Sequence, residues 1–148
     1  MVMGIKQFQR LFREAARLNI DKNDVKRLSD FVGKRLRNLL ILGQVAANIN
    51  GRDIIDYQDI PITGGLQQAI RDFKEFDEEL SLKPILEQQA TLPPLKLGIS
   101  DMVEKKIPDI VGGITVSLAR VFKAVNPDLK NPGSREWEQV EEIYRILL

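Results

Sequence analysis

Apolar residues recur at steps of three and four through most of this sequence, which is the period of an α-helix with one buried face. The longest such run extends from Val25 to Ile49. Asp21 and Asp24 precede it and can accept hydrogen bonds from the free amides of a first helical turn. Asn50-Gly51 follows it and is typical of a helix C-terminus. The sequence therefore predicts an all-α protein organised around a long helix.

A shorter helix is predicted on each side of this long one. Apolar residues spaced at three and four predict the first over residues 5–18. A short extended segment, residues 52–57, follows the long helix. Residues 58–61 are expected to start a third helix or a turn. The apolar face of the helix lies in residues 66–73, with a break at Gly64-Gly65 near its beginning.

The second part of the chain repeats this order of elements. The pattern predicts a medium helix over residues 76–86, a long helix over residues 100–126 and a closing helix over residues 137–147. The residue identities do not repeat, but the order and the relative lengths do. We therefore expect two similar three-helix halves, residues 1–74 and 75–148, folded into one body.

Three features of the second long helix lead to specific expectations. Ser100 is placed to cap its first turn. Pro108 is expected either to kink the helix or to mark its true start, because proline lacks an amide hydrogen. Gly112-Gly113 lies near the midpoint, where missing side chains either let another helix approach closely or absorb the kink.

The composition excludes several classes of function. The chain contains no Cys and no His, so disulfides, thiolate metal sites and the usual general base are excluded. The sequence has neither a phosphate-binding glycine loop nor a paired-carboxylate catalytic signature on one helix. We expect a protein that is not an enzyme, with no catalytic residues, no cofactor and no bound metal. The most apolar stretch, Leu39 to Ala47, is too short to cross a bilayer. A soluble, cytoplasmic protein is expected.

The segment from Gly51 to Ile60 carries a resemblance to a known family. It reads GRDIIDYQDI and resembles the second loop of histones, where Gly-Arg precedes an Asp that opens the last helix. The resemblance implies that Arg52 and Asp59 form a buried structural clamp between loop and helix. More narrowly, the chain resembles the bacterial double-histone-fold proteins, including those of thermophiles. It implies two tandem histone folds packed as a monomeric pseudo-dimer, although Pro127–Lys130 replaces the clamp in the second half.

The charge distribution bears on whether such a protein binds nucleic acid. The net charge is +1, but residues 1–74 hold 13 Lys and Arg against 8 Asp and Glu, whereas residues 75–148 hold 9 against 13. A basic front half would attract an anionic partner such as duplex DNA. The candidate nucleic-acid-binding residues are Arg10, Arg13 and Arg17, spaced to share one helical face, together with Lys22, Lys26, Arg27 and Lys34.

The same loop that carries the resemblance argues against DNA binding. Asp53 and Asp56 stand where DNA-binding histones often have Lys, and Ile54 stands where a Thr commonly contacts phosphate. Two hypotheses therefore stay open. One is a histone-like, nucleoid-associated protein that binds DNA without sequence preference, and the other is a histone-fold module that binds protein partners. Trp137 and Tyr144 recur at a helical spacing, which favours the core over base stacking.

Overall fold

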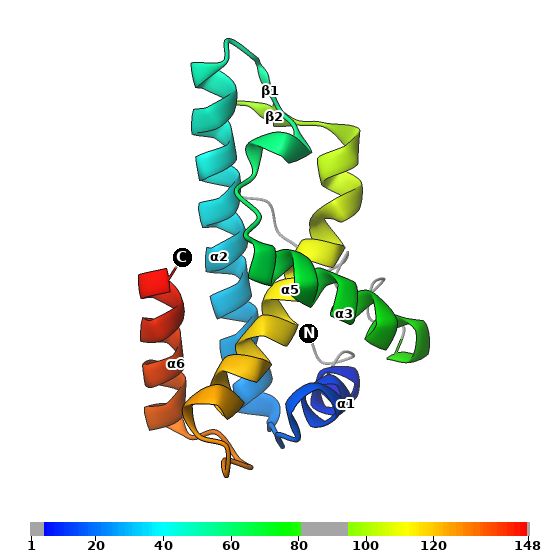
Figure 1. Ribbon diagram of the computed structural model, residues 1–148, viewed down its shortest axis with the longest axis vertical. Helices are drawn as coiled ribbons and strands as arrows, with labels where there is room; N and C mark the ends of the chain where they lie inside the picture. The colour runs from blue at the N-terminus through cyan, green and yellow to red at the C-terminus, as the bar shows by residue number, and fades with distance from the viewer. Residues whose placement is uncertain (1–4, 81–94, 148) are drawn as a thin grey trace.

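The computed structural model describes residues 5–80 and 95–147, and within them the protein is mostly helical (Figure 1). A 3-10 helix (Tyr57–Asp59) follows the first of two strands of two residues each. The helices are α1 (Ile5–Ala16), α2 (Lys22–Ile49), α3 (Gly64–Leu80), α5 (Asp101–Val125) and α6 (Ser134–Leu147), and the strands are β1 (Ile54–Ile55) and β2 (Gly98–Ile99).

The long helix α2 begins and ends as the sequence predicts. The Asp21 carboxylate accepts a hydrogen bond from the Asp24 amide at 2.8 Å, and the Asp24 carboxylate accepts one from the Asp21 amide at 2.9 Å. Reciprocal bonds of this kind satisfy amides that have no partner within the helix. Beyond the C-terminus, Gly51 has φ +69°, a conformation that glycine adopts without steric cost.

The second long helix, α5, is continuous through Pro108, so this proline does not mark its start. Ser100 caps the helix as predicted and accepts a hydrogen bond from the Val103 amide at 3.2 Å. The two glycines at its midpoint lie against α3. A Cβ built on Gly112 would lie 2.4 Å from the Phe73 ring, and one on Gly113 would lie 2.5 Å from the Ile70 side chain. The glycines therefore let α3 approach α5 closely.

The third predicted helix differs from expectation. Residues 57–59 form a separate 3-10 turn, and Gly64-Gly65 begins α3 instead of interrupting it. Of the two alternatives expected for residues 58–61, the start of a helix or a turn, a turn forms, because Asp56 and Asp59 cap it. Helix α3 also continues to Leu80, so the proposed boundary after residue 74 falls inside it. The rest of the medium helix expected over residues 76–86 lies outside the described residues.

The two long helices cross, and the segments that flank them meet at both ends of the molecule (Figure 1). At one end β1 pairs in parallel with β2, with Ile54 opposite Gly98 and Ile55 opposite Ile99. At the other end the Asn19 amide donates a hydrogen bond to the Lys130 carbonyl oxygen at 2.7 Å. The segments that flank α2 and α5 are thus hydrogen-bonded to each other at both ends of the molecule, although they lie far apart in the sequence.

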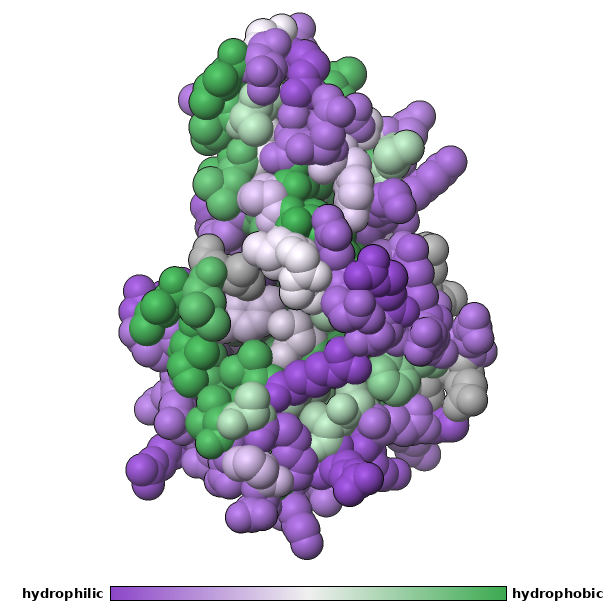
Figure 2. Space-filling view, viewed as in Figure 1, coloured by the Kyte–Doolittle hydropathy of each residue, from purple (hydrophilic) through white to green (hydrophobic). Residues whose placement is uncertain are grey.

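One hydrophobic core fills the space between these helices. Its fully buried side chains include Phe12 of α1, Leu40 of α2, Phe73 of α3, Phe122 of α5 and Trp137 of α6. The preference of Trp137 for the core is confirmed, since it is 1% exposed. Polar side chains cover much of the visible surface, but apolar groups show along α2 and α6 (Figure 2). None of the described helices combines the length and apolar character needed to cross a bilayer.

Candidate nucleic-acid interface

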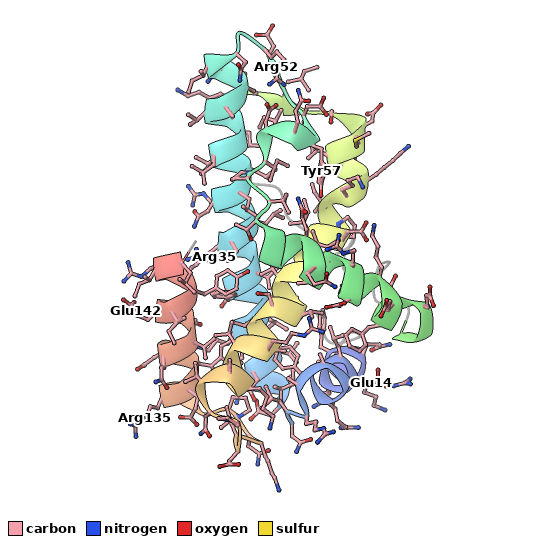
Figure 3. All side chains as sticks on the ribbon, in the orientation of Figure 1. Glu14, Arg35, Arg52, Tyr57, Arg135 and Glu142 are labelled. Atoms are coloured by element: carbon pink, nitrogen blue, oxygen red, sulfur yellow. The ribbon has the colours of Figure 1, made fainter. Side chains whose placement is uncertain are left out.

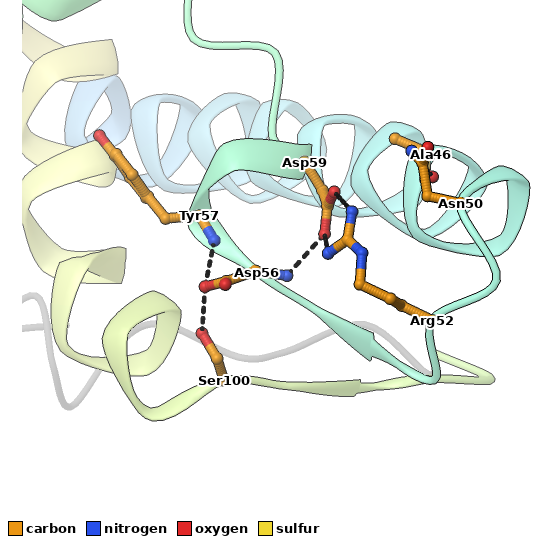
Figure 4. A network of polar contacts seen from close by, with 7 residues as sticks. All are labelled: Ala46, Asn50, Arg52, Asp56, Tyr57, Asp59 and Ser100. Atoms are coloured by element: carbon orange, nitrogen blue, oxygen red, sulfur yellow. Dashed lines mark hydrogen bonds and ion pairs between the residues drawn. The ribbon is translucent and has the colours of Figure 1, made fainter.

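Arg52 lies beyond the end of α2 (Figure 3). It forms a two-pronged ion pair with Asp59, its partner in the histone resemblance (Figure 4). Arg52 Nη1 donates to Asp59 Oδ2 at 2.7 Å, and Arg52 Nη2 donates to the other carboxylate oxygen. The Asp56 amide donates a third bond to Asp59, at 2.8 Å. Asp59 is buried, whereas about a third of the Arg52 side chain is exposed. The pair fixes the loop that follows α2 onto the 3-10 turn.

This arrangement lowers the pKa of Asp59 below its ordinary value. The hydrogen bond from Arg52 is the largest cause, followed by the bond from the Asp56 amide, since both favour the charged carboxylate. A carboxyl whose pKa is lower in the folded state stabilises the fold above its unfolded pKa of 3.8. That stabilisation is lost as the pH falls through the pKa that Asp59 has in the folded protein.

We expect Arg52→Ala to lower the melting temperature at pH 7 by more than the control Asp53→Ala, whose carboxylate is exposed. The difference between Arg52→Ala and the parent should shrink as the pH falls below about 4, because Asp59 of the unfolded chain then takes up a proton while the folded carboxylate, whose pKa is lower, keeps its charge. Thermal unfolding followed by circular dichroism from pH 7 to pH 3 measures both effects. A gap that stays constant over this range would show that Asp59 does not act through its charge.

A second set of polar contacts joins this loop to the start of α5 (Figure 4). Ser100 donates from its hydroxyl to Asp56 at 3.2 Å and from its amide to the Ile55 carbonyl oxygen at 3.0 Å. Asp56 also accepts a bond from the Tyr57 amide at 2.9 Å. Asp56, one of the two acidic residues that weaken the DNA-binding prediction, thus has a structural role. Asp53, Asp101 and Glu104 are exposed nearby together with Lys96 and Lys105, so acidic and basic side chains are mixed at this end.

The opposite end of the molecule is richer in exposed cations, and we call it the basic end. It is formed where the segment before α2 meets the segment after α5. Figure 3 labels Arg135 at this end, at the start of α6. Within the described residues, none of the cations of the basic end forms an ion pair. They are Arg13, Arg17, Lys22, Lys26, Lys130 and Arg135, all exposed.

Some of the predicted DNA-binding residues form ion pairs, unlike the exposed cations of the basic end. Arg10 pairs with Glu14 at 3.1 Å. Arg27 is bound within the fold, because it contacts Glu141 at 3.2 Å and lies over the Trp137 ring, 5.7 Å from its centre.

Arg17 also departs from its expected position. Helix α1 ends at Ala16, and Arg17 has φ +54°, so it leaves the helix. The prediction that it shares one helical face with Arg10 and Arg13 was therefore wrong. Lys34 is exposed farther along α2, where it lines a groove of about 580 Å³ between α2 and α6 with Asp30 and Glu138.

Sequence reasoning missed Lys130, because it treated the second half as acidic overall. No local signal marks this lysine, since it lies far from Lys22 in the sequence. The pairing of the segments around Asn19 and Lys130 brings it to the basic end. The signal that could have found it is the loop pairing that the histone resemblance implies.

Comparison with known proteins identifies the family. A protein of Aquifex aeolicus (strain VF5) is 33% identical over 143 residues, covering 88% of this chain and 83% of the relative. A crystal structure from Thermus thermophilus superposes with a TM-score of 0.88 at 43% identity over the whole of both chains. A crystal structure of an Aquifex aeolicus protein, at 23% identity and a TM-score of 0.85, shares the fold; the match covers 98% of this chain and 95% of that one. Residues 8–145 match the family described as Domain of unknown function (DUF1931), and the chain belongs to that family.

Proposed function

We propose that this protein is a non-enzymatic, histone-like protein that binds duplex DNA through its basic end without reading the base sequence. The observation that carries the proposal is the group of exposed cations around Lys22 and Lys130, which have no ion pair within the described part of the chain. Lysine and arginine that are not neutralised within the protein are free to neutralise phosphates. The protein would then act in the cytoplasm, on the nucleoid.

Three features support a pair of tandem histone folds in one chain. Two long helices cross, a shorter helix follows each of them, and the flanking segments of one half meet those of the other at both ends. The ion pair between Arg52 and Asp59 matches the clamp of that family. Joining the two halves in one chain makes their association intramolecular, which favours a pseudo-dimer.

The two ends of this pseudo-dimer differ in charge, and this favours DNA contact at one end only. The end around β1 and β2 exposes Asp53, Asp101 and Glu104, which repel phosphate. The basic end exposes Lys22, Lys26 and Lys130 without ion pairs among the described residues. A few phosphate contacts and no base contacts give weak binding that depends steeply on salt.

Fluorescence anisotropy with a labelled duplex at 50 and 200 mM salt tests the proposal. We expect binding at 50 mM that weakens strongly at 200 mM. In Lys22→Ala/Lys130→Ala the slope of log affinity against log salt should fall by about 2, since each phosphate that is no longer neutralised reduces it by about 0.9. The matched control is Lys96→Ala/Lys105→Ala, which removes two exposed lysines from the other end and should leave the slope unchanged. No binding at 50 mM, or equal losses in both variants, would refute the proposal.

The second candidate is a protein-interaction module that does not bind DNA. A specific observation favours it, because α2 exposes apolar side chains, among them Ile49 at 78% and Leu42 at 50%. Exposed apolar groups that lie together mark surfaces where proteins associate. The same titration separates the candidates, since a module of this kind shows no duplex binding even at 50 mM salt.

A further inference from the structure

The C-terminal half of α2 exposes an apolar surface that no described part of the fold covers. Ile41, Leu42, Val45 and Ile49 are 38%, 50%, 49% and 78% exposed, and we call these four residues the α2 stripe. They recur at steps of three and four, so they lie along one side of the helix. No charged residue occurs between residues 38 and 51. A solvent-facing helix ordinarily carries charged residues on that side.

Further apolar side chains extend the surface beyond the helix. Ile54 follows the C-terminus of α2 and is 54% exposed. Leu42 lines a small hollow together with Leu66 and Tyr144, which brings α6 beside the stripe. Ile146 at the end of α6 is 70% exposed. Figure 2 shows apolar groups over this part of α2 and again over α6.

We propose that a second copy of this chain docks on the α2 stripe, so that two pseudo-dimers associate side by side. The available surface has the size that such a dimer needs. The exposed aliphatic groups of α2, β1 and the end of α6 amount to roughly 500 Å² of apolar area, the upper range for the largest patch on a monomer. A standard interface takes about 800 Å² from each partner, a little over half of it apolar.

The charges at the two ends of the stripe favour a second copy in the antiparallel direction. Arg37 precedes the stripe and Asp53 follows it, each eight residues from Val45 in the sequence. Both side chains are exposed, and neither forms an ion pair within the described residues. A two-fold axis near Val45 sets Ile41 of one copy against Ile49 of the other, and in this arrangement we expect Arg37 of each copy to face the loop after α2 of its partner, which carries Asp53. Two-fold interfaces are self-complementary in this way.

Sedimentation equilibrium over a range of protein concentrations tests the proposal on the whole chain. The parent should be dimeric at tens of micromolar. Val45→Lys places a charge at the centre of the interface and should weaken association at least 100-fold, while circular dichroism stays unchanged because Val45 is half exposed. The matched control Val125→Lys, at an exposed valine at the end of α5, should remain dimeric. A parent that is monomeric throughout, or a dimer that survives Val45→Lys, would overturn the proposal.

A charge exchange tests the antiparallel direction. Arg37→Glu should weaken the dimer about tenfold, because the new carboxylate at position 37 of each copy then faces the Asp53 carboxylate of the other copy. Arg37→Glu/Asp53→Lys restores opposite charges across the two-fold axis and should recover association. Failure of the double variant to recover would exclude the antiparallel arrangement. None of these variants changes the basic end, so their outcome is independent of DNA binding.

Discussion

Trp137→Ala is expected to destabilise the protein by about 3–5 kcal/mol, the cost of removing a large aromatic side chain from a packed core. Trp137 is 1% exposed and meets the Phe122 ring edge to face, with 4.9 Å between ring centres. Its indole nitrogen donates a hydrogen bond to the Asp24 carboxylate at 2.8 Å. One side chain therefore joins α6 to α5 and to the first turn of α2. Chemical denaturation followed by circular dichroism measures the decrease in the free energy of unfolding.

Trp137→Phe separates packing from hydrogen bonding. Phenylalanine keeps most of the apolar contact with Phe122 but cannot donate to Asp24. We expect a smaller loss, with about 1 kcal/mol of it from the missing hydrogen bond, because Asp24 is partly exposed to water. If Trp137→Ala cost no more than Trp137→Phe, the packing of α6 on α5 would contribute little to stability.

Gly113→Ala is the second substitution with a large expected effect. An alanine Cβ at this position would lie 2.5 Å from Ile70 Cγ1, and 3.1 Å and 3.2 Å from the Ile70 backbone nitrogen and Cα. Because the backbone of α3 cannot yield as a side chain can, the two helices must move apart. We expect a loss of about 1–3 kcal/mol, typical of an overpacked core. Denaturant titration of the variant measures it.

Gly33→Ala is the matched control for this prediction. Gly33 also lies inside a long helix, but no described atom lies within 4 Å of the position of its missing Cβ. Alanine favours the helix over glycine by about 1 kcal/mol, so this substitution should stabilise the protein. The same chemical change is thus expected to act in opposite directions at the two positions. Stabilisation by both substitutions would show that α3 and α5 are not closely packed at Gly113.

The sequence predicted the ends of the two long helices correctly, because local contacts produce them. The reciprocal bonds of Asp21 and Asp24 and the left-handed Gly51 involve residues close together in the chain. The pairing of Arg52 with Asp59 spans one loop and was implied by the resemblance. The segment before the third helix also follows local contacts, since residues 57–59 form a turn, one of its two expected structures, and α3 begins only at Gly64.

The candidate site was predicted only in part. Charge counting found Lys22 and Lys26, which are exposed at the basic end, but it also selected Arg27. Helical spacing on α2 does not reveal that Glu141 and Trp137 of α6 hold this arginine. A sequence can suggest that a basic residue contacts phosphate, but only the fold shows whether that residue already forms an ion pair within the protein.

The sequence alone determined the helical character, the two long helices and their caps, because these depend on residues a few positions apart. Only the tertiary structure decided which surface each helix presents. It placed Lys130 beside the segment of Asn19, packed α3 against Gly112 and Gly113, and left the α2 stripe exposed. These features depend on contacts between distant segments, and a hydrophobic period identifies a buried face without naming the element that covers it.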